Sequence, residues 1–305
     1  MRSNSLKGVF AIALSTVFYG MVGVLSRFIG ISFGIFSQSW TRNLIVCLVV
    51  LIISIIFIRD WKQIQKKDLP WILFWTISGI VASVSFFVVA NYLTLGTTII
   101  LFYAGSNISG YFSGRIFFKE KLNFLKVIAI LLSFFGVAII YSFNISLNNF
   151  GYLILAFIAG FATGLWNTIS KKFSNTYPQL QLVFIDGLMS FIVTLIIALI
   201  LKESLPQITL TLSWLSVIFF ALGQVITVLL TIYGFKRLEA QIGTLVMPLE
   251  VFWAALFGFL FFKETLTVVT IFGGIFIISG IIIPNLRIFT KSTNKLPRAE
   301  SPRYS

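Results

Sequence analysis

Long apolar segments alternate with short polar connections along almost the whole chain. A helix that crosses the hydrocarbon core of a bilayer needs about 20 predominantly apolar residues. Ten segments of this kind can be drawn, at residues 8–28, 37–58, 70–93, 97–118, 122–142, 150–170, 179–201, 212–234, 240–262 and 266–286. They lack the period-two alternation that membrane-spanning strands show. The pattern predicts an all-α membrane protein with ten transmembrane helices.

The composition agrees with a chain that is solvated by lipid. Hydrophobic residues make up 58% and charged residues 10% of its 305 positions, whereas about a quarter of the residues of a soluble domain are charged. Too few polar residues remain to cover a water-soluble core. The first apolar segment, Gly8 to Phe28, is too long for the apolar region of a signal peptide. We therefore expect it to remain as the first helix.

The 23 Lys and Arg residues outnumber the 9 Asp and Glu residues, which gives a formal net charge of +14. Arg42 lies inside a predicted helix, and only Arg27, Lys202 and Lys263 lie on the side opposite the two termini; the other 19 lie on the side of the termini. Because Lys and Arg collect in cytoplasmic loops, the pattern predicts a multi-pass inner-membrane protein with both termini in the cytoplasm. Residues 291–305 form a basic cytoplasmic tail. The cations are scattered through short loops and predict no nucleic-acid partner.

A shift of 144 residues superimposes the two halves of the sequence without a gap. The tetrad Phe-Phe-Lys-Glu at residues 117–120 then falls on the same tetrad at residues 261–264. Each repeat contains five predicted helices, and an odd number makes the second copy start on the opposite side of the membrane. Residues 1–145 and 146–290 are therefore expected to be two inverted five-helix repeats within one structural domain. Secondary transporters are commonly built this way, with the substrate site near the midplane between the repeats.

The end of each half resembles the EamA family of the drug/metabolite transporter superfamily, in which a helix closes on an acidic turn before Leu and a Gly-containing last helix. The matching residues are Phe118-Lys119-Glu120-Lys121-Leu122 with Gly136, and Phe262-Lys263-Glu264-Thr265-Leu266 with Gly280. Family members usually carry Gly just before the Glu, where this chain has Lys119 and Lys263. The departure falls at the same position in both halves.

Two further segments carry the same resemblance. Ser39-Trp40-Thr41-Arg42 is similar to the family's arginine early in helix 2, and Met247-Pro248-Leu249-Glu250 to its Pro and Glu within helix 9. The resemblance covers residues 8–286. It implies a transporter of amino acids, drugs or other metabolites, with a central cavity among helices 1, 3, 4, 6, 8 and 9.

Three charged side chains, Arg42, Asp186 and Glu250, fall well inside predicted helices. Such a charge costs about 2.5–3.5 kcal/mol at the centre of a span and is a candidate for function by default. Inversion places Arg42 and Asp186 toward opposite sides, too far apart for a direct ion pair, and Arg42 can extend outward to the interface. We therefore expect structural roles for Arg42 and Asp186. Glu250 lies near the midplane and can bind a substrate ammonium group or couple transport to protons; alternatively, it bonds backbone freed by Pro248 or pairs with Arg42.

Neutral polar and aromatic residues within the spans are further candidates for substrate binding. They are Tyr19, Ser83, Tyr103, Ser106, Asn107, Thr163, Trp166, Asn167 and Gln224. Such side chains also hold helices together, so each can instead be structural. A lining of Ser106, Asn107, Trp166 and Glu250 favours a substrate with an amino group and an apolar or aromatic body.

Two other patterns favour packing and the membrane surface over ligand binding. The pairs Gly110–Gly114 and Gly160–Gly164 have the spacing that lets two helices approach closely; such faces can slide in a transporter, but ordinary packing explains them as well. Trp61, Trp71 and Trp75 lie near a predicted interface and suit an aromatic belt. We assign neither pattern to a site.

Missing motifs narrow the class of function. The sequence has no histidine, which excludes a His-ligated metal site and a His-based catalytic triad, and it has no phosphate-binding Gly-x4-Gly-Lys-Ser/Thr loop. It predicts no enzyme, no metal and no cofactor. The leading hypothesis is a secondary transporter that exports an amino acid or related amine-bearing compound by alternating access, with that molecule and the bilayer as partners. A lipid-linked carrier or drug flippase of the same superfamily and a non-transporting membrane scaffold are the alternatives. No oligomeric state is predicted.

Overall fold

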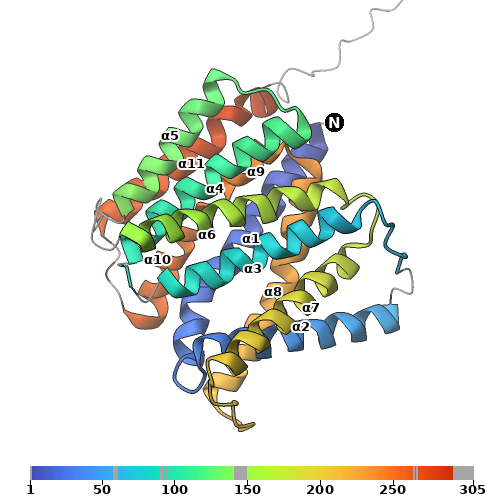
Figure 1. Ribbon diagram of the computed structural model, residues 1–305. Coiled ribbons are helices and arrows are strands. Elements are labelled where there is room, and N and C mark those ends of the chain that lie inside the picture. Colours follow the sequence, from blue (N-terminus) through green and yellow to red (C-terminus); the bar gives the residue numbers. More distant parts are fainter. Residues whose placement is uncertain are drawn as a thin grey trace, which may run out of the picture.

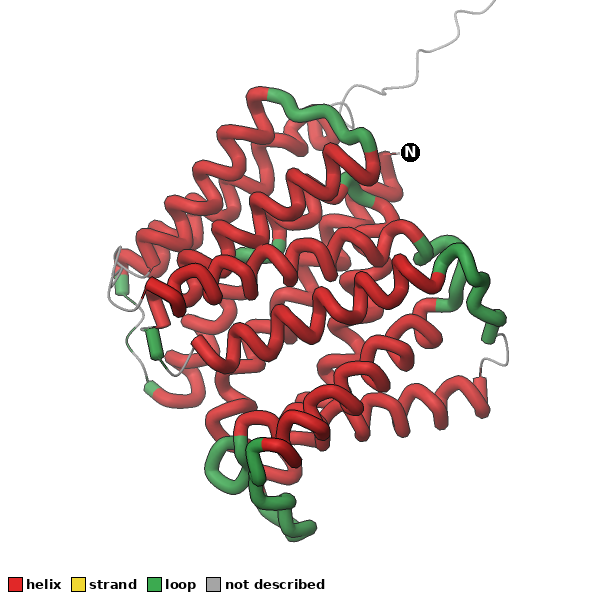
Figure 2. Tube along the Cα trace, in the orientation of Figure 1, coloured by secondary structure: helices red, strands yellow, loops and turns green. Residues whose placement is uncertain are grey.

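The computed structural model describes residues 2–57, 61–89, 92–93, 95–140, 150–263, 265 and 267–290. Glu264, Leu266 and the basic tail at 291–305 lie outside the described residues. All regular elements of the described part are helices, which pack side by side in one bundle (Figures 1 and 2). In chain order they are α1 (Arg2–Ile29), α2 (Ile35–Phe57), α3 (Leu69–Val89), α4 (Leu95–Phe118), α5 (Phe124–Ile140), α6 (Phe150–Ile169), η1 (Ser170–Lys172), α7 (Gln179–Ile200), α8 (Leu212–Arg237), α9 (Ala240–Val246), α10 (Leu249–Phe262) and α11 (Val268–Thr290).

The helices follow the predicted apolar segments in order, and the prediction of an all-α membrane protein is confirmed. In the described residues, 7 helical segments are long and apolar enough to cross a membrane, and Phe124–Ile140 and Val268–Ile283 are shorter apolar helices. Helices α9 and α10 share the ninth predicted span and are separated at Met247 and Pro248. Proline has no backbone N–H and interrupts the hydrogen-bond ladder of a helix. The interruption places Glu250 in the first turn of α10.

The 144-residue repeat is visible in the backbone. Helix α2 begins at Ile35 and helix α7 at Gln179, which is 144 residues later. Helices α4 and α10 each end just before a lysine with a left-handed backbone, Lys119 with φ 54° and Lys263 with φ 56°. These lysines are also 144 residues apart. Each stands where members of the EamA family, which the sequence resembles, usually have glycine. The chain therefore keeps the left-handed turn that glycine favours without the glycine.

Contacts between helix ends show that the two repeats are inverted. Lys171, just after α6, lies over the ring of Phe118 at the end of α4, 4.7 Å from its centroid. The repeat-equivalent pair is Arg27 at the end of α1 and Phe262 at the end of α10, where the distance is 4.5 Å. Four successive spans bring the end of α4 to the membrane face where α1 starts. Because α6 ends there too, it crosses the membrane in the direction opposite to α1.

Helix packing follows the same two-fold relation. Helix α1 packs on α8 and α10, and its counterpart α6 packs on α3 and α4. Two pairs join equivalent helices directly, α2 with α7 and α5 with α11. Figure 1 shows these two pairs at opposite ends of the bundle, with the remaining helices between them. The central helices therefore come from both repeats, and any cavity among them lies at the junction of the repeats.

The interpretation of Trp75 as part of an aromatic belt is wrong. Its side chain is 0% exposed and stacks on Trp166 of α6, with ring centroids 6.0 Å apart. The indole N–H of Trp75 donates to the backbone oxygen of Trp166 at 2.8 Å. A buried indole satisfies its polar atom in this way. Trp75 is thus part of the α3–α6 packing, whereas Trp61 is 38% exposed.

Replacement of Lys119 by glycine is expected to stabilise the fold by about 0.5–1 kcal/mol, because a left-handed L-residue costs about 1–2 kcal/mol and glycine's greater entropy in the unfolded chain offsets part of that gain. Lys119 is exposed, so little packing is lost. The measurement is reversible unfolding in mixed detergent micelles. Lys119→Ala removes the same charge but keeps the Cβ atom and should give no gain. An equal gain from both variants would show that the charge, not the backbone, is responsible.

Candidate functional site

A cavity of about 680 Å³ lies at the junction of the two repeats. This volume falls within the range of small-molecule sites, about 300–1,000 Å³. Its lining residues come from α1, α2, α3, α4, α6, α7, α8 and the α9–α10 segment. The resemblance implied a cavity among helices 1, 3, 4, 6, 8 and 9; the structure adds α2 and α7. Together these helices bring Arg42 and Asp186 to the cavity wall.

Most of the residues predicted to bind substrate line this cavity. They are Tyr19, Ser83, Tyr103, Ser106, Thr163, Trp166, Asn167, Gln224 and Glu250. Asn107 is not among the lining residues, although it is only 2% exposed. Neighbouring positions on a helix are about 100° apart, so Ser106 and Asn107 cannot share one face of α4. Substrate binding by the lining residues remains a prediction.

Glu250 lies at the start of α10, beside the interruption of the ninth span. Tyr103 lies beside Glu250, and the Tyr103 hydroxyl donates to the backbone oxygen of Met247, three residues before Glu250, at 3.4 Å. The start of a helix favours a negative charge, so the position suits an ionised carboxylate. Within the described residues, the ion pairs of the structure do not include one between Glu250 and Arg42. The alternative in which these two side chains pair is therefore not observed.

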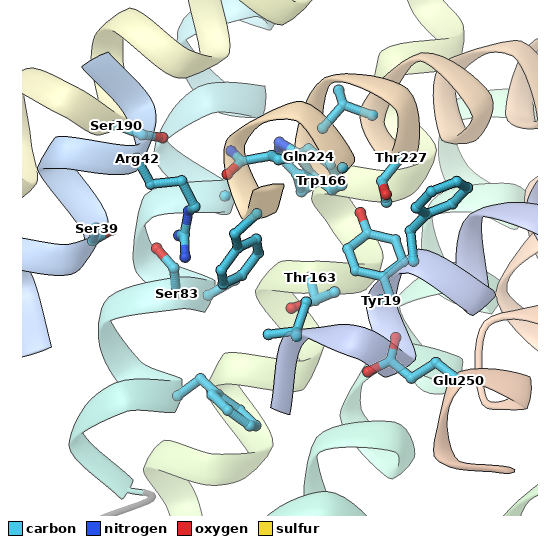
Figure 3. A pocket seen from close by; sticks show the side chains of 18 of the residues that line it. Tyr19, Ser39, Arg42, Ser83, Thr163, Trp166, Ser190, Gln224, Thr227 and Glu250 are labelled. Atoms are coloured by element: carbon cyan, nitrogen blue, oxygen red, sulfur yellow. The ribbon is translucent and has the colours of Figure 1, made fainter. Parts of the chain in front are cut away.

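Arg42 faces the cavity rather than the membrane surface. Its side chain is 8% exposed, and the central guanidinium carbon lies 4.1 Å from the centroid of the Phe220 ring on α8. The expectation that it extends outward to the interface is wrong, because the Phe220 ring holds the guanidinium inside the bundle. Figure 3 shows Arg42 on one side of the cavity, with Glu250 and Tyr19 on the other.

Asp186 is the third charge of the cavity and comes from α7. It is 7% exposed, and one carboxylate oxygen accepts a hydrogen bond from the indole N–H of Trp166 at 2.9 Å. The ion pairs found among the described residues do not join Asp186 to Arg42. This agrees with the prediction that the repeat-equivalent positions are too far apart to pair directly. Trp166 thus presents an indole face to the cavity while its N–H fixes Asp186.

The walls between these charges are largely aromatic. The aromatic lining residues besides Tyr19, Tyr103 and Trp166 are Phe18, Phe86, Phe87, Phe102, Phe219 and Phe220. Sequence reasoning missed this wall, because phenylalanine is frequent throughout the spans. It also missed Ser39 and Asn43, which lie three residues before and one after Arg42. Helical spacing supplies a signal for Ser39, since a residue three positions before Arg42 shares its face of α2; Asn43, the immediate neighbour of Arg42, carries no such signal.

Several buried polar atoms at the cavity have no hydrogen-bond partner among the described residues. They are Nε of Arg42, Oε1 of Gln224, and both side-chain polar atoms of Asn167. The other end of Gln224 is occupied, since its Nε2 donates to Oδ1 of Asn43 at 2.9 Å. Buried polar groups are normally paired, and each exception needs an explanation. The missing partners of these cavity-lining atoms are explained if a polar ligand forms the hydrogen bonds that the protein does not supply.

No three of the residue types His, Cys, Asp and Glu come together as a potential metal site in the part of the chain that the structure describes. The arrangement has instead one cation and two carboxylates spread around an aromatic-walled cavity. It is suited to binding a small organic molecule with polar ends and an apolar body.

Comparison with known proteins identifies a solved structure with a similar fold and a family whose model matches the sequence. A solved structure described as "Crystal structure of protein" superimposes with a TM-score of 0.77 over 95% of this chain and 99% of its own, at 14% sequence identity. That likeness concerns the fold alone. No curated protein matches the chain. The EamA-like transporter family matches twice in tandem, over residues 6–142 and 150–286. The chain therefore belongs to the EamA-like transporter family and is a multi-pass membrane transporter, not an enzyme.

Proposed function

We propose that the protein is a secondary transporter that exports an amino acid or a related amine-bearing compound across the inner membrane, with both termini in the cytoplasm. The termini are assigned from the 19-to-3 distribution of Lys and Arg. Alternating access is supported by the inverted repeats, since rocking of one repeat against the other opens a fixed central site to each side in turn. Both repeats contribute helices to the lining of the cavity.

The observation that carries the proposal is Glu250 on the cavity wall with no cationic partner among the described residues. An isolated carboxylate away from water is costly unless it is paired or bonded. Tyr103 lies beside this carboxylate, and a substrate ammonium group supplies the missing positive charge. The aromatic walls then cover the apolar body of the substrate, and aromatic faces also attract an ammonium group.

The same carboxylate offers a route for proton coupling. After an ammonium group leaves, Glu250 can take up a proton, so that the empty carrier returns without an unpaired charge at this position. A carrier of this kind exchanges substrate for a proton across the membrane. Transport in liposomes should then respond to an imposed proton gradient in the presence of substrate.

The proposal is tested by substrate flux into liposomes that contain only the purified protein. We expect Glu250→Gln to lower the flux of an amine-bearing substrate at least tenfold, which corresponds to a loss of about 1.4 kcal/mol or more. Gln keeps the size of the side chain but cannot carry the charge. Glu239→Gln is the control, because the Glu239 side chain is 50% exposed and does not line the cavity. Equal flux in wild type and Glu250→Gln for every amine that is carried would contradict the proposal.

A further inference from the structure

Arg42 is a buried cation for which the described residues provide no anion. The described ion pairs of the structure involve other residues, and Arg42 Nε has no acceptor within the described residues. Its contact with the Phe220 ring, at 4.1 Å, attracts the cation but supplies no hydrogen-bond acceptor. An arginine inside a span is retained at a cost of about 2.5–3.5 kcal/mol. Some other group must therefore balance this charge when the cavity is filled.

The surroundings of Arg42 offer polar atoms but leave the guanidinium free to bind. Asn43 is already bonded to Gln224, with Gln224 Nε2 donating to Asn43 Oδ1 at 2.9 Å. Ser39 and Ser190 also line this part of the cavity. In Figure 3 the guanidinium extends from α2 into the cavity, away from the helix that carries it. The side chain is thus placed for a ligand within the cavity.

The charges of the cavity define the class of ligand. Asp186 is bonded to the Trp166 indole at 2.9 Å, and Glu250 and Arg42 lie on separate sides of the cavity in Figure 3. A guanidinium binds carboxylates and phosphates through paired hydrogen bonds. Here a single cation shares the cavity with two carboxylates, so a group with one negative charge fits and a dianionic phosphate does not.

We propose that Arg42 binds the carboxylate of the transported molecule while Glu250 binds its ammonium group, so that the substrate carries opposite charges at its two ends with an apolar body between them. The inference rests on the proposed function. It adds that the substrate also carries a negative charge and that this charge binds at Arg42. A substrate with only an amine leaves Arg42 unpaired. A substrate with both charges pairs Arg42 and Glu250 and brings no net charge into the membrane.

The separation of the two poles makes the proposal specific. In an α-amino acid both charges sit next to one carbon atom, whereas Arg42 and Glu250 lie on separate sides of an aromatic-walled cavity. A chain of several methylene groups between the two charges fits the walls better. We therefore expect a preference for substrates such as ω-amino acids, and a weaker interaction with phenylalanine.

The test uses purified protein in detergent and three probes of equal chain length: 6-aminohexanoate, hexylamine and hexanoate. We expect wild type to bind 6-aminohexanoate at least tenfold more tightly than either singly charged probe, measured by calorimetry. Arg42→Gln should reduce the affinity for 6-aminohexanoate to that for hexylamine and leave the affinity for hexylamine within about twofold, since a charge-assisted hydrogen bond accounts for roughly a tenfold effect or more. Arg42→Lys keeps the charge and should recover part of the loss.

The outcomes separate this inference from the proposed function. If wild type binds 6-aminohexanoate no more tightly than hexylamine, or if Arg42→Gln weakens both probes equally, the inference fails while an amine carrier that depends on Glu250 still stands. If phenylalanine binding depends on Arg42 and 6-aminohexanoate binding does not, the two charges of the substrate lie together and the separation of the poles is wrong. The wild-type comparison of the three probes decides the matter even if Arg42→Gln fails to fold.

Discussion

Gly160→Ala in α6 is expected to lower the free energy of unfolding by about 3 kcal/mol or more, and Gly160→Val to leave little folded protein, because overfilling a packed interface forces backbone shifts. A Cβ atom at this position would overlap the backbone of Phe102 on α4, including its carbonyl oxygen. Gly105 of α4 meets the backbone of Phe157 and Phe161 in the same way. The two helices therefore touch backbone to backbone, and no side-chain rotation can make room.

Gly151 of the same helix is a matched control. A Cβ atom there has nothing within 4 Å, so Gly151→Ala should be neutral or slightly stabilising, as expected for an exposed helical position. Both variants can be compared by unfolding in mixed micelles and by the yield of monodisperse protein. Equal stabilities of Gly160→Ala and Gly151→Ala would show that α4 and α6 are not in backbone contact in the membrane.

The α4–α6 contact also bears on transport. Ser106 of α4 and Thr163, Trp166 and Asn167 of α6 line the cavity. A forced separation of these helices moves two adjoining parts of the wall of the candidate site, so substrate flux should fall together with stability in Gly160→Ala. The pair Gly160–Gly164, which the sequence alone assigns to no site, is thus expected to affect the site through the position of its walls.

The sequence allowed most of the fold to be predicted because the bilayer restricts the choice of structure. Backbone groups in hydrocarbon must bond within their own segment, so each long apolar run has to be a helix. The constant offset of 144 residues then predicted the inverted repeat, and the left-handed backbones of Lys119 and Lys263 show that equivalence directly. What hydropathy could not separate was a buried aromatic residue from one at the interface. Trp75 and Trp61 were both placed near a predicted interface, but packing against α6 buries Trp75 and leaves Trp61 38% exposed.

The candidate site was predicted less completely, for a reason of geometry. Helices that are apolar on all faces give little sign of which face meets the cavity, so Asn107 was included with Ser106 although only Ser106 lines it. The role of Arg42 depends on its contact with Phe220, a residue 178 positions away in the sequence. Contacts of that range are fixed by the assembly of the two repeats, and no local pattern encodes them. Single charges inside spans, such as Glu250, were found because their cost singles them out.

Glu120→Ala is expected to lower the free energy of unfolding by about 3–5 kcal/mol, the usual result of removing one partner from a buried ion pair. Glu120, singled out in the sequence only as part of the repeated motif, is 8% exposed and joins three segments. It accepts a hydrogen bond from Lys171 at 2.8 Å and from the backbone N–H groups of Ala240 at 2.7 Å and Gln241 at 3.1 Å. Its loss leaves a cation and two N–H groups at the start of α9 without an acceptor.

Glu239→Ala is the control for this effect. Glu239 lies beside the same helix start and pairs with Lys126, but its side chain is 50% exposed, and Lys126 keeps bonds to Lys121 O at 2.8 Å and Gln241 Oε1 at 2.7 Å. Lys126 is itself buried, with 6% of its side chain exposed, but it keeps these two acceptors and Glu239 is half in solvent, so this variant should cost about 1 kcal/mol, clearly less than Glu120→Ala. A loss from Glu120→Ala no larger than that from Glu239→Ala would contradict the assignment.

A double-mutant cycle with Lys171→Met separates the ion pair from the backbone bonds. If the pair carries most of the effect, Lys171→Met should recover more than 1 kcal/mol in the Glu120→Ala background, since removing both partners costs less than leaving one buried alone. The remaining deficit then belongs to the N–H groups of Ala240 and Gln241, and Glu120→Gln, which keeps an acceptor oxygen, should restore part of it. Because Glu120 comes from the first repeat and both N–H groups from the second, the deficit measures how firmly the two repeats are joined at this end of the bundle. An alternating-access carrier has to break and re-form a junction of this kind in each transport cycle.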